Sequence, residues 1–326
     1  MTKTEIIEYL TDIQLLTSAS DNTNATDEKI NFYYVRFGPV RILFCKNKNR
    51  ITFNSFNLYQ PGRRSLSILY KGLKIINDYA PNWFLGLFLR KIEIPPCQLN
   101  LRFSGGLRAV FLGAASEERK FICVYDDFIE KQCFNALGQR KLSNEISAMD
   151  NLKDTTLSNF IIPHKVIRST DGFNILQTKF ISAKKASKTE QKDFVMTFAR
   201  SLLFHQSKNN FSRRGPSHGD FTPWNIRFGD TRSYIIDWEN YSNDRPLLYD
   251  LFYFFFMQAA LGVNDYNRDK ALIDVRTLYE ALRLEFGEIL PEFSVAFNDW
   301  YKFIISDGTS ELTIKKYFIK YGYPNV

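Results

Sequence analysis

Short apolar runs separated by polar turns dominate the first 180 residues, and longer helical patterns dominate the rest. Within residues 32–56 the runs FYYVRF, VRILFC and ITFNSF are typical of β-strands, and GRRSLSILYKGLKIINDY at 62–79 predicts a helix. The polar stretch 16–30 indicates a connector, and IPPC at 94–97 breaks the chain. We therefore expect residues 1–95 to form an N-terminal extension of mixed structure.

The next region carries the pattern of an antiparallel meander. The runs RAVFLG, KFICVYD and FIEKQCF, within residues 108–134, are rich in β-branched and aromatic residues, and the turns AASEE and Asp-Asp separate them. Two further runs, KVIRS and FNILQTKF, flank Thr170-Asp171-Gly172, which predicts a hairpin. These strands define a small lobe expected at 96–180.

Helical periodicity appears first at 139–153 and then over most of the chain from residue 188 onward. The prediction is therefore an α+β, bilobal protein with a small antiparallel-sheet lobe and a mostly helical lobe at 181–326. In the helix predicted at 139–153, Glu145 falls inside an apolar arc of about 120°. The arc consists of Leu142, Ile146, Met149 and Leu152.

A carboxylate on a buried face needs a cationic partner, or it protonates. For Glu145, one alternative is a local ion pair at the rim of the helix with Lys141 or Arg140. The other is a cation brought from elsewhere in the fold.

Composition places the chain among soluble globular proteins, with 326 residues, 44% of them apolar and 24% charged. The net charge of +8 favours anionic partners such as nucleotides, phosphosugars or a membrane surface. The positive charges are scattered, with no run typical of a nucleic-acid-binding arm, so we expect no nucleic-acid partner. The oligomeric state is left open.

The cysteines lack CxxC spacing and nearby His pairs, so we expect reduced thiols in a cytoplasmic protein rather than a zinc site or disulfides. The N-terminus MTKTEIIEYL lacks the apolar core of a signal peptide. The apolar stretch at 247–263 is interrupted by Asp250 and predicts a buried helix. WFLGLFL at 83–89 is too short to span a bilayer and allows at most a weak membrane-surface contact.

The candidate chemistry lies in HGDFTPWNI, which begins at His218, and in IIDWE, which follows a short turn. The runs NIRF and SYIIDW flank the turn GDTR and predict a hairpin. If the hairpin is centred on Thr231, Asn225 lies opposite Asp237, and Asp220 lies on the loop just before it. One amide oxygen and two carboxylates converging there suit Mg²⁺, which prefers oxygen ligands.

This pattern resembles the aminoglycoside phosphotransferase/choline kinase family, a branch of the protein-kinase-like fold. The resemblance rests on His218-Gly219-Asp220 with Asn225 and on Ile235-Ile236-Asp237. It implies ATP- and Mg²⁺-dependent phosphoryl transfer to a hydroxyl, with Asp220 as the catalytic base. It also implies that Asn225 and Asp237 bind magnesium, and that His218 holds the catalytic loop together.

The resemblance requires a strand-borne Lys that grips the nucleotide phosphates and is braced by a helix Glu. Lys131 precedes Glu145 by fourteen residues and would give that buried carboxylate its partner. Lys120 is the competing candidate, and we favour Lys131.

Two backbone segments would complete the nucleotide site. The loop from Gly113 to Ser116 lies between the first two strands of the meander, where its N–H groups would cover the phosphates. It departs from the Gly-rich pattern of the family. The backbone from Gln177 to Lys179 is expected to meet adenine.

Departures from the protein-kinase pattern favour a small acceptor. Gly219 stands where protein kinases have Arg, and Trp238-Glu239 stands where they have Phe-Gly. Only twelve residues separate Asp237 from Asp250, which leaves no room for a long activation loop that would dock a polypeptide. Asp250 is expected to tie its helix to the catalytic loop.

The form HGDFTPWN and the β-containing extension look similar to kinase-like proteins of bacterial surface-polysaccharide assembly. A sugar or glycan hydroxyl is therefore the expected acceptor, bound near Trp300 and Tyr301 unless these aromatic residues belong to the core. Alternatives are an amino-alcohol or aminoglycoside acceptor, a non-catalytic binding or scaffold protein of the same fold, and a metal-dependent hydrolase.

Overall fold

A computed structural model of the protein describes most of the second half of the chain and selected segments of the first. The described residues are 7, 10–11, 30–35, 42–47, 50–51, 68, 71–73, 75–76, 79, 87–94, 106–112, 120–133, 135–169, 172–182, 184, 186–207, 213–263, 266–306 and 312–322. The chain divides into two compact units. One unit comprises Met1–Ser143 and Ile162–Ala183, and the other comprises Asn144–Ile161 and Lys184–Val326.

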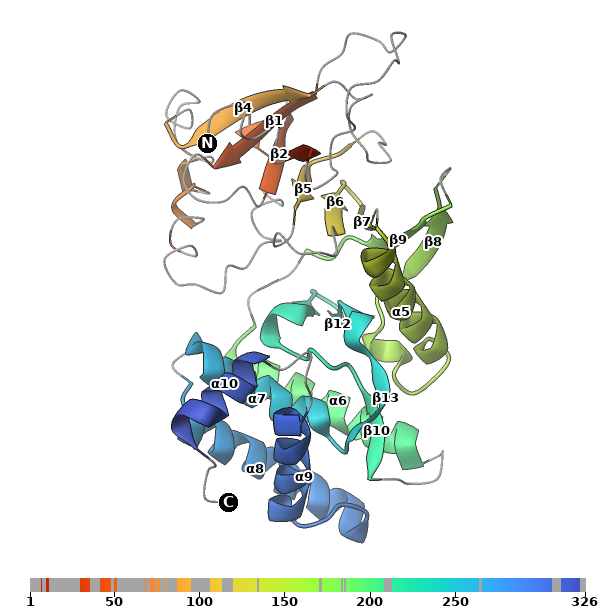
Figure 1. Ribbon diagram of the computed structural model, residues 1–326, viewed down its shortest axis with the longest axis vertical. Helices are drawn as coiled ribbons and strands as arrows, with labels where there is room; N and C mark the ends of the chain where they lie inside the picture. Colours follow the sequence, from red (N-terminus) through yellow and green to blue (C-terminus); the bar gives the residue numbers. More distant parts are fainter. Residues whose placement is uncertain are drawn as a thin grey trace. The chain divides into compact units, whose positions relative to one another are not determined.

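The first unit is built on a nine-stranded sheet whose described pairings are all antiparallel. The strand order is β4-β1-β2-β5-β6-β7-β9-β8, and β3 pairs with β2 (Figure 1). The strands are β1 (Ile30–Val35), β2 (Ile42–Asn47), β3 (Arg50–Ile51), β4 (Leu89–Ile94), β5 (Ala109–Phe111), β6 (Lys120–Val124), β7 (Phe128–Cys133), β8 (His164–Arg168) and β9 (Asn174–Lys179).

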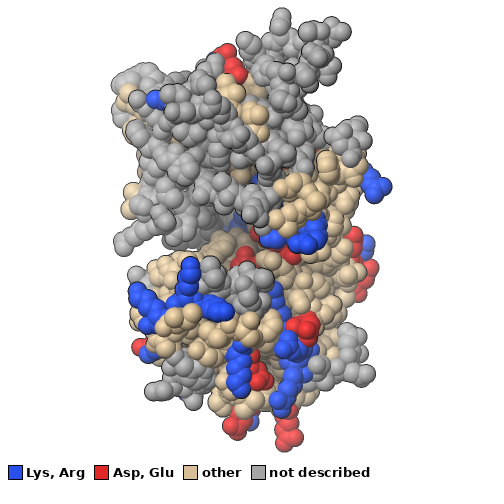
Figure 2. All heavy atoms as spheres, viewed as in Figure 1, with Lys and Arg blue, Asp and Glu red and all other residues tan. Residues whose placement is uncertain are grey.

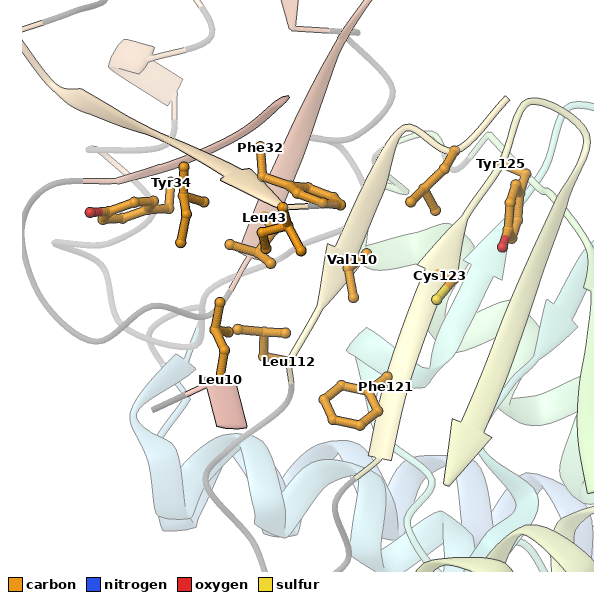
Figure 3. Close-up of a cluster of buried hydrophobic side chains, with 12 residues drawn as sticks. Leu10, Phe32, Tyr34, Leu43, Val110, Leu112, Phe121, Cys123 and Tyr125 are labelled. Atoms are coloured by element: carbon orange, nitrogen blue, oxygen red, sulfur yellow. The ribbon is translucent and has the colours of Figure 1, made fainter. Parts of the chain in front are cut away.

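One buried cluster joins strands from both halves of this sheet. Phe32 of β1 and Leu43 of β2 belong to the same cluster as Val110 of β5 and Phe121 of β6 (Figure 3). Leu43 is also the pairing partner of Val110 across the β2–β5 ladder. The strands expected in a separate extension at 1–95 therefore continue the sheet of the small lobe expected at 96–180. In the helix expected at 62–79, the described residues are helical.

The second unit is mostly helical and also contains two short antiparallel pairs, β10–β13 and β11–β12 (Figure 1). Helix α5 (Ala136–Leu152) runs through the change of unit at residue 143. The remaining elements are η2 (Ser158–Phe160), α6 (Lys188–Ser207), β10 (Arg214–Ser217), η3 (Pro223–Asn225), β11 (Ile226–Phe228), β12 (Ser233–Ile235), η4 (Trp238–Asn240), β13 (Ser242–Pro246), α7 (Tyr249–Leu261), α8 (Arg268–Phe286), η6 (Gly287–Ile289), α9 (Phe293–Ser306) and α10 (Leu312–Tyr321).

Helix α7 forms the centre of this unit, as its continuous apolar sequence predicts. Ten of its residues are buried, including Asp250, and Phe252 and Phe256 contact aromatic rings of α9. Trp300 of α9 is fully buried, with its ring centroid 5.5 Å from that of Phe252. No described helix is long and apolar enough to cross a membrane.

The α+β class predicted from the sequence is confirmed, with a sheet in one unit and helices in the other. The helix predicted at 139–153 is α5, and the Asn135 side chain caps its start by accepting from the Gly138 N–H over 2.8 Å. Glu145 is 2% exposed, so the predicted buried carboxylate is present. Figure 2 shows Lys and Arg side chains intermixed with Asp and Glu on the visible face of the helical unit.

Candidate active site

The HGD loop is fixed to helix α7 by one buried carboxylate. Asp250 accepts hydrogen bonds from the backbone N–H groups of His218, over 2.6 Å, and Gly219, over 3.0 Å. Burial raises the pKa of Asp250 to about 6, while these two hydrogen bonds and the charge of Arg245 act in the opposite direction. The expected tie between the helix and the loop is therefore present.

His218 connects the same loop to the end of strand β12. Its Nε2 donates to the Ile236 carbonyl over 2.9 Å, and its Nδ1 accepts from the Asp220 N–H over 3.2 Å. This pair of bonds requires the neutral ring with the proton on Nε2. The ring is fully buried and lies edge-on to Trp238, with centroids 4.7 Å apart. His218 thus has the position expected of a residue that holds the loop.

Gly219 stands where protein kinases have Arg, and the backbone explains why this chain has glycine there. Its φ is +90°, which favours glycine. A Cβ at this position would collide with the Arg245 guanidinium and with the backbone oxygen of Asn240. Arg245 is itself buried and lies over the Tyr249 ring, 4.7 Å from its centroid. The Arg245 charge that acts on Asp250 therefore belongs to β13, whereas protein kinases have an Arg in the loop itself.

The carboxylate of Asp220 is held by two donors. The Asn225 side-chain amide donates to Oδ2 over 3.0 Å and to the backbone oxygen over 2.8 Å, and the Tyr253 hydroxyl donates to Oδ1 over 3.1 Å. Burial, followed by the charge of Asp237, raises the pKa of Asp220 to about 6, and the two hydrogen bonds oppose the rise. The Asp220 carboxylate is thus held in one orientation by hydrogen bonds, and its pKa lies above the ordinary value.

The predicted hairpin exists, but its register differs by one residue from the expected pairing. Ile226 pairs with Ile235 and Phe228 with Ser233. Continued by one residue, this register places Ile236, and not Asp237, opposite Asn225. The centre lies between Asp230 and Thr231 because residues 229–232 form the turn, closed by the Gly229 N–H to the Arg232 carbonyl over 3.1 Å. The Ile236 N–H accordingly bonds to the Asn225 carbonyl over 2.9 Å.

Asp237 follows this hairpin in a left-handed conformation, with φ 70° and ψ 52°. Such a backbone is uncommon for residues other than glycine and occurs often at functional sites. The carboxylates of Asp237, Glu239 and Glu145 offer oxygen atoms that all lie within 4.8 Å of one another. An all-oxygen set of this kind fits a hard cation such as Mg²⁺.

The donors at this site fit the expected magnesium. The side-chain nitrogen of Asn225 donates to Asp220, so the side-chain oxygen of Asn225 is the atom that would bind a metal. Asp237 and Glu239 offer oxygen atoms within 4.8 Å of each other, and the charges of both raise the pKa of Asp220. Glu239 and Glu145 are thus candidate ligands that the sequence reasoning assigned no metal role, although the Asp-Trp-Glu spacing contains the signal for Glu239.

The predicted nucleotide residues of the first unit lie on its central strands. Lys131 of β7 is 8% exposed, whereas Lys120 of β6 is half-buried. Glu130, which precedes Lys131 on β7, is buried. Its carboxylate accepts hydrogen bonds from the side chains of Gln177 and Gln132, over 3.0 and 3.1 Å. Gly113 and Ser116 lie outside the described residues.

The backbone expected to meet adenine is part of a three-strand pairing. Strand β9 lies between β7 and β8, and Gln177 pairs with Glu130 on one side and Lys165 on the other. The Lys179 N–H bonds to the Pro163 carbonyl over 3.1 Å. The backbone of Gln177 thus lies inside the sheet, and its contact with adenine stays a prediction.

The expected acceptor residues at α9 have different positions. Trp300 is completely buried among Phe252, Phe256 and Phe297, so it belongs to the aromatic core and cannot stack on an acceptor. Tyr301 is half-buried, with its ring edge-on to Phe318. Trp224, on the HGD loop, is half-buried.

An oriented carboxylate next to oxygen atoms that suit a divalent cation is the arrangement that phosphoryl transfer requires. Residues 182–283 match the model of the phosphotransferase enzyme family, and this region contains the HGD loop, Asn225 and Asp237. The resemblance predicted from the motifs is confirmed over that region. Glu145 lies outside it.

Solved structures show the same kind of similarity at low identity. Aminoglycoside phosphotransferase APH(2″)-IIa, in a complex with streptomycin and ATP, is 15% identical, and the match covers 64% of this chain and 90% of that one, with a TM-score of 0.38. Choline kinase LicA from Streptococcus pneumoniae is 16% identical, with coverages of 61% and 95% and a TM-score of 0.31. A choline/ethanolamine kinase family protein from Mesorhizobium loti is 13% identical, with coverages of 66% and 92% and a TM-score of 0.31. No curated protein sequence matches the chain.

Proposed function

We propose that the protein transfers the γ-phosphoryl group of ATP to a hydroxyl of a small molecule or glycan in a Mg²⁺-dependent reaction. The observation that carries this proposal is the Asp220 carboxylate, which is oriented by Asn225 and Tyr253 and lies near the acidic residues Asp237 and Glu239. This arrangement supplies a base for a hydroxyl and oxygen ligands for a cation within one site.

In the proposed reaction, Asp220 accepts the proton of the acceptor hydroxyl as the hydroxyl oxygen bonds to the γ-phosphorus. The bond from that phosphorus to the β–γ bridging oxygen breaks, and ADP leaves. Asn225, Asp237 and Glu239 would hold Mg²⁺, which when bound neutralises charge on the phosphate oxygens. Lys131 is proposed to contact the phosphates, because a buried Lys on a central strand suits this role.

For the acceptor we propose a sugar or glycan hydroxyl, as in the assembly of a bacterial surface polysaccharide. The support is the resemblance of HGDFTPWN to proteins of that kind. The alternative is an aminated acceptor, since the similar solved structures include proteins named for aminoglycosides and choline. We propose that the reaction takes place in the cytoplasm, where ATP is available. A weak contact with an anionic membrane surface is compatible with the charge of +8.

The test is phosphate transfer from radiolabelled ATP to a panel of sugars, glycans, amino-alcohols and aminoglycosides. We expect transfer to at least one acceptor, with a loss of about 10²- to 10⁴-fold in Asp220→Ala, because a positioned base supplies about that much. Asp244→Ala is the matched control, since that carboxylate is 82% exposed. Full activity of Asp220→Ala would refute the assigned base, and MgATP binding without any transfer would favour the scaffold alternative.

A further inference from the structure

A pocket of about 530 Å³ opens on the second unit, lined by one face of α6, by η2 and by the turn between β11 and β12. The α6 residues that line it recur at helical spacing and include Asp193, Phe194 and Thr197. The volume lies within the range of pockets that bind small organic molecules.

Part of the pocket lining is aromatic. Phe194 lies edge-on to Phe160 and to Phe228, with ring centroids 5.5 and 5.4 Å apart, and all three rings line the cavity. Phe160 and Phe228 are buried, and Phe194 is partly exposed. These rings offer an apolar surface on which a flat or aliphatic group can pack.

Another part of the lining is held in place before any ligand arrives. The Arg232 guanidinium donates to the carbonyls of Ser158 and Asn159, over 3.0 and 2.7 Å, and to the Asn159 side chain over 2.9 Å. It also lies over the Tyr234 ring at 5.3 Å. A wall fixed in this way reduces the cost of ordering the pocket on binding.

The rim of the pocket is acidic, although the protein as a whole carries +8. Three acids (Glu190, Asp193 and Asp230) face two bases (Lys184 and Arg232), so the local balance is one excess negative charge. The Glu190 carboxylate forms an ion pair with Lys184 over 3.3 Å and accepts a hydrogen bond from the Ser187 N–H over 2.7 Å. Among the described residues, the carboxylates of Asp193 and Asp230 have no ion-pair or hydrogen-bond partner.

From this arrangement we propose that the pocket binds a small organic cation with an apolar body, such as an arylalkylamine. The ammonium would lie between Asp193 of α6 and Asp230 of the turn, and the apolar body would pack on Phe194. The pocket is separate from the candidate active site. Its turn forms one end of the β11–β12 hairpin, and Asn225 and Asp237 flank the other end, about 10 Å away for strands of three residues.

The test is a ligand-observed NMR titration of the full chain with phenethylamine, beside its neutral isostere 2-phenylethanol. We expect saturable binding of the amine and at least about tenfold weaker binding of the alcohol. Equal affinity for the two compounds would overturn the proposal, as would no binding of the amine up to about 10 mM.

Two variants locate the binding. The double variant Asp193→Asn with Asp230→Asn should weaken binding of the amine by about tenfold or more. The control is Asp154→Asn with Asp269→Asn, which removes the same charge from exposed positions and should leave the affinity for the amine unchanged. Thr197→Phe, at an exposed position of α6, should fill the pocket and abolish binding. Thermal unfolding confirms that each variant is folded. Unchanged amine affinity in the double Asp variant or in Thr197→Phe would overturn the proposal. Unchanged amine affinity in Asp220→Ala would show that this site is separate from the proposed catalytic one.

Discussion

The Tyr253 hydroxyl donates a hydrogen bond to Oδ1 of Asp220 over 3.1 Å, while the Asn225 amide occupies Oδ2. Both donors favour the ionised carboxylate, whereas burial and the charge of Asp237 favour the protonated one, and the balance sets the pKa at about 6. The proposed base is therefore ionised at pH 7 and loses that state as the pH falls through about 6.

Replacing Tyr253 by Phe should shift the acid limb of the pH–activity profile to higher pH. The variant lacks a hydrogen bond that lowers the pKa of Asp220, so that pKa rises further and the base protonates earlier as the pH falls. The measurement is kcat/KM for phosphate transfer as a function of pH. Tyr241→Phe is the control, because its hydroxyl bonds to Asn243 instead. An acid limb that stays in place in Tyr253→Phe would contradict the role of this hydrogen bond.

Gly219→Ala should destabilise the protein and reduce transfer. The positive φ alone costs about 1–3 kcal/mol for a residue with a Cβ, and the collision with Arg245 adds to it. If Arg245 is the obstacle, the double variant Gly219→Ala with Arg245→Ala should lose less stability than the sum of the two single losses. Urea unfolding of the four proteins measures this coupling, and strictly additive losses would show that Arg245 does not limit the position.

Mg²⁺ should stabilise the protein against heat, and Glu239→Gln should reduce this effect. The carboxylates of Asp237, Glu239 and Glu145 offer oxygen atoms within 4.8 Å of one another, which suits a divalent cation, and a ligand at about 100 times its Kd contributes about 2.7 kcal/mol. The measurement is the Tm with Mg²⁺ and with EDTA. Glu292→Gln, at a 73% exposed position, is the matched control. An equal Mg²⁺ effect in Glu239→Gln and in the unmodified protein would remove Glu239 from the ligand set.

Trp300→Ala should cost about 3–5 kcal/mol in the free energy of unfolding, because it empties a fully buried aromatic site. Chemical denaturation measures this loss. Trp300→Phe keeps most of the core volume and should leave the KM for the acceptor unchanged. A large increase in that KM in Trp300→Phe, with unchanged stability, would show that Trp300 contacts the acceptor after all.

Local sequence patterns sufficed for much of the fold and for the centre of the site. The alternating runs predicted β5, β6 and β7, and the spacing of His218, Asp220 and Asn225 predicted side chains that meet because few residues separate them. The hairpin was predicted as well, but its turn GDTR allows a centre on Thr231 or beside it. Hydrogen bonding between Gly229 and Arg232 decides the register, and composition does not reveal it.

The contacts that the sequence could not supply are tertiary. Tyr253 is one aromatic among several in YDLFYFFF, and only the rotation of α7 against the loop aims its hydroxyl at Asp220. Arg245 reaches Gly219 from another strand, so no spacing rule connects the two. Trp300 lies at a helical position that suits either a core or a binding surface, and packing alone distinguishes these.

The ladder between β2 and β5 has a practical consequence for anyone who shortens the chain. A fragment beginning at residue 96 would lack β1, β2 and β4 and would leave β5 as an open edge, with Val110 and Leu112 bared to solvent. Exposed edges of this kind recruit other chains, so such a fragment should precipitate on expression more readily than the 326-residue chain. Strands β1, β2 and β4 would then protect the edge of β5 from pairing with a second copy of the chain.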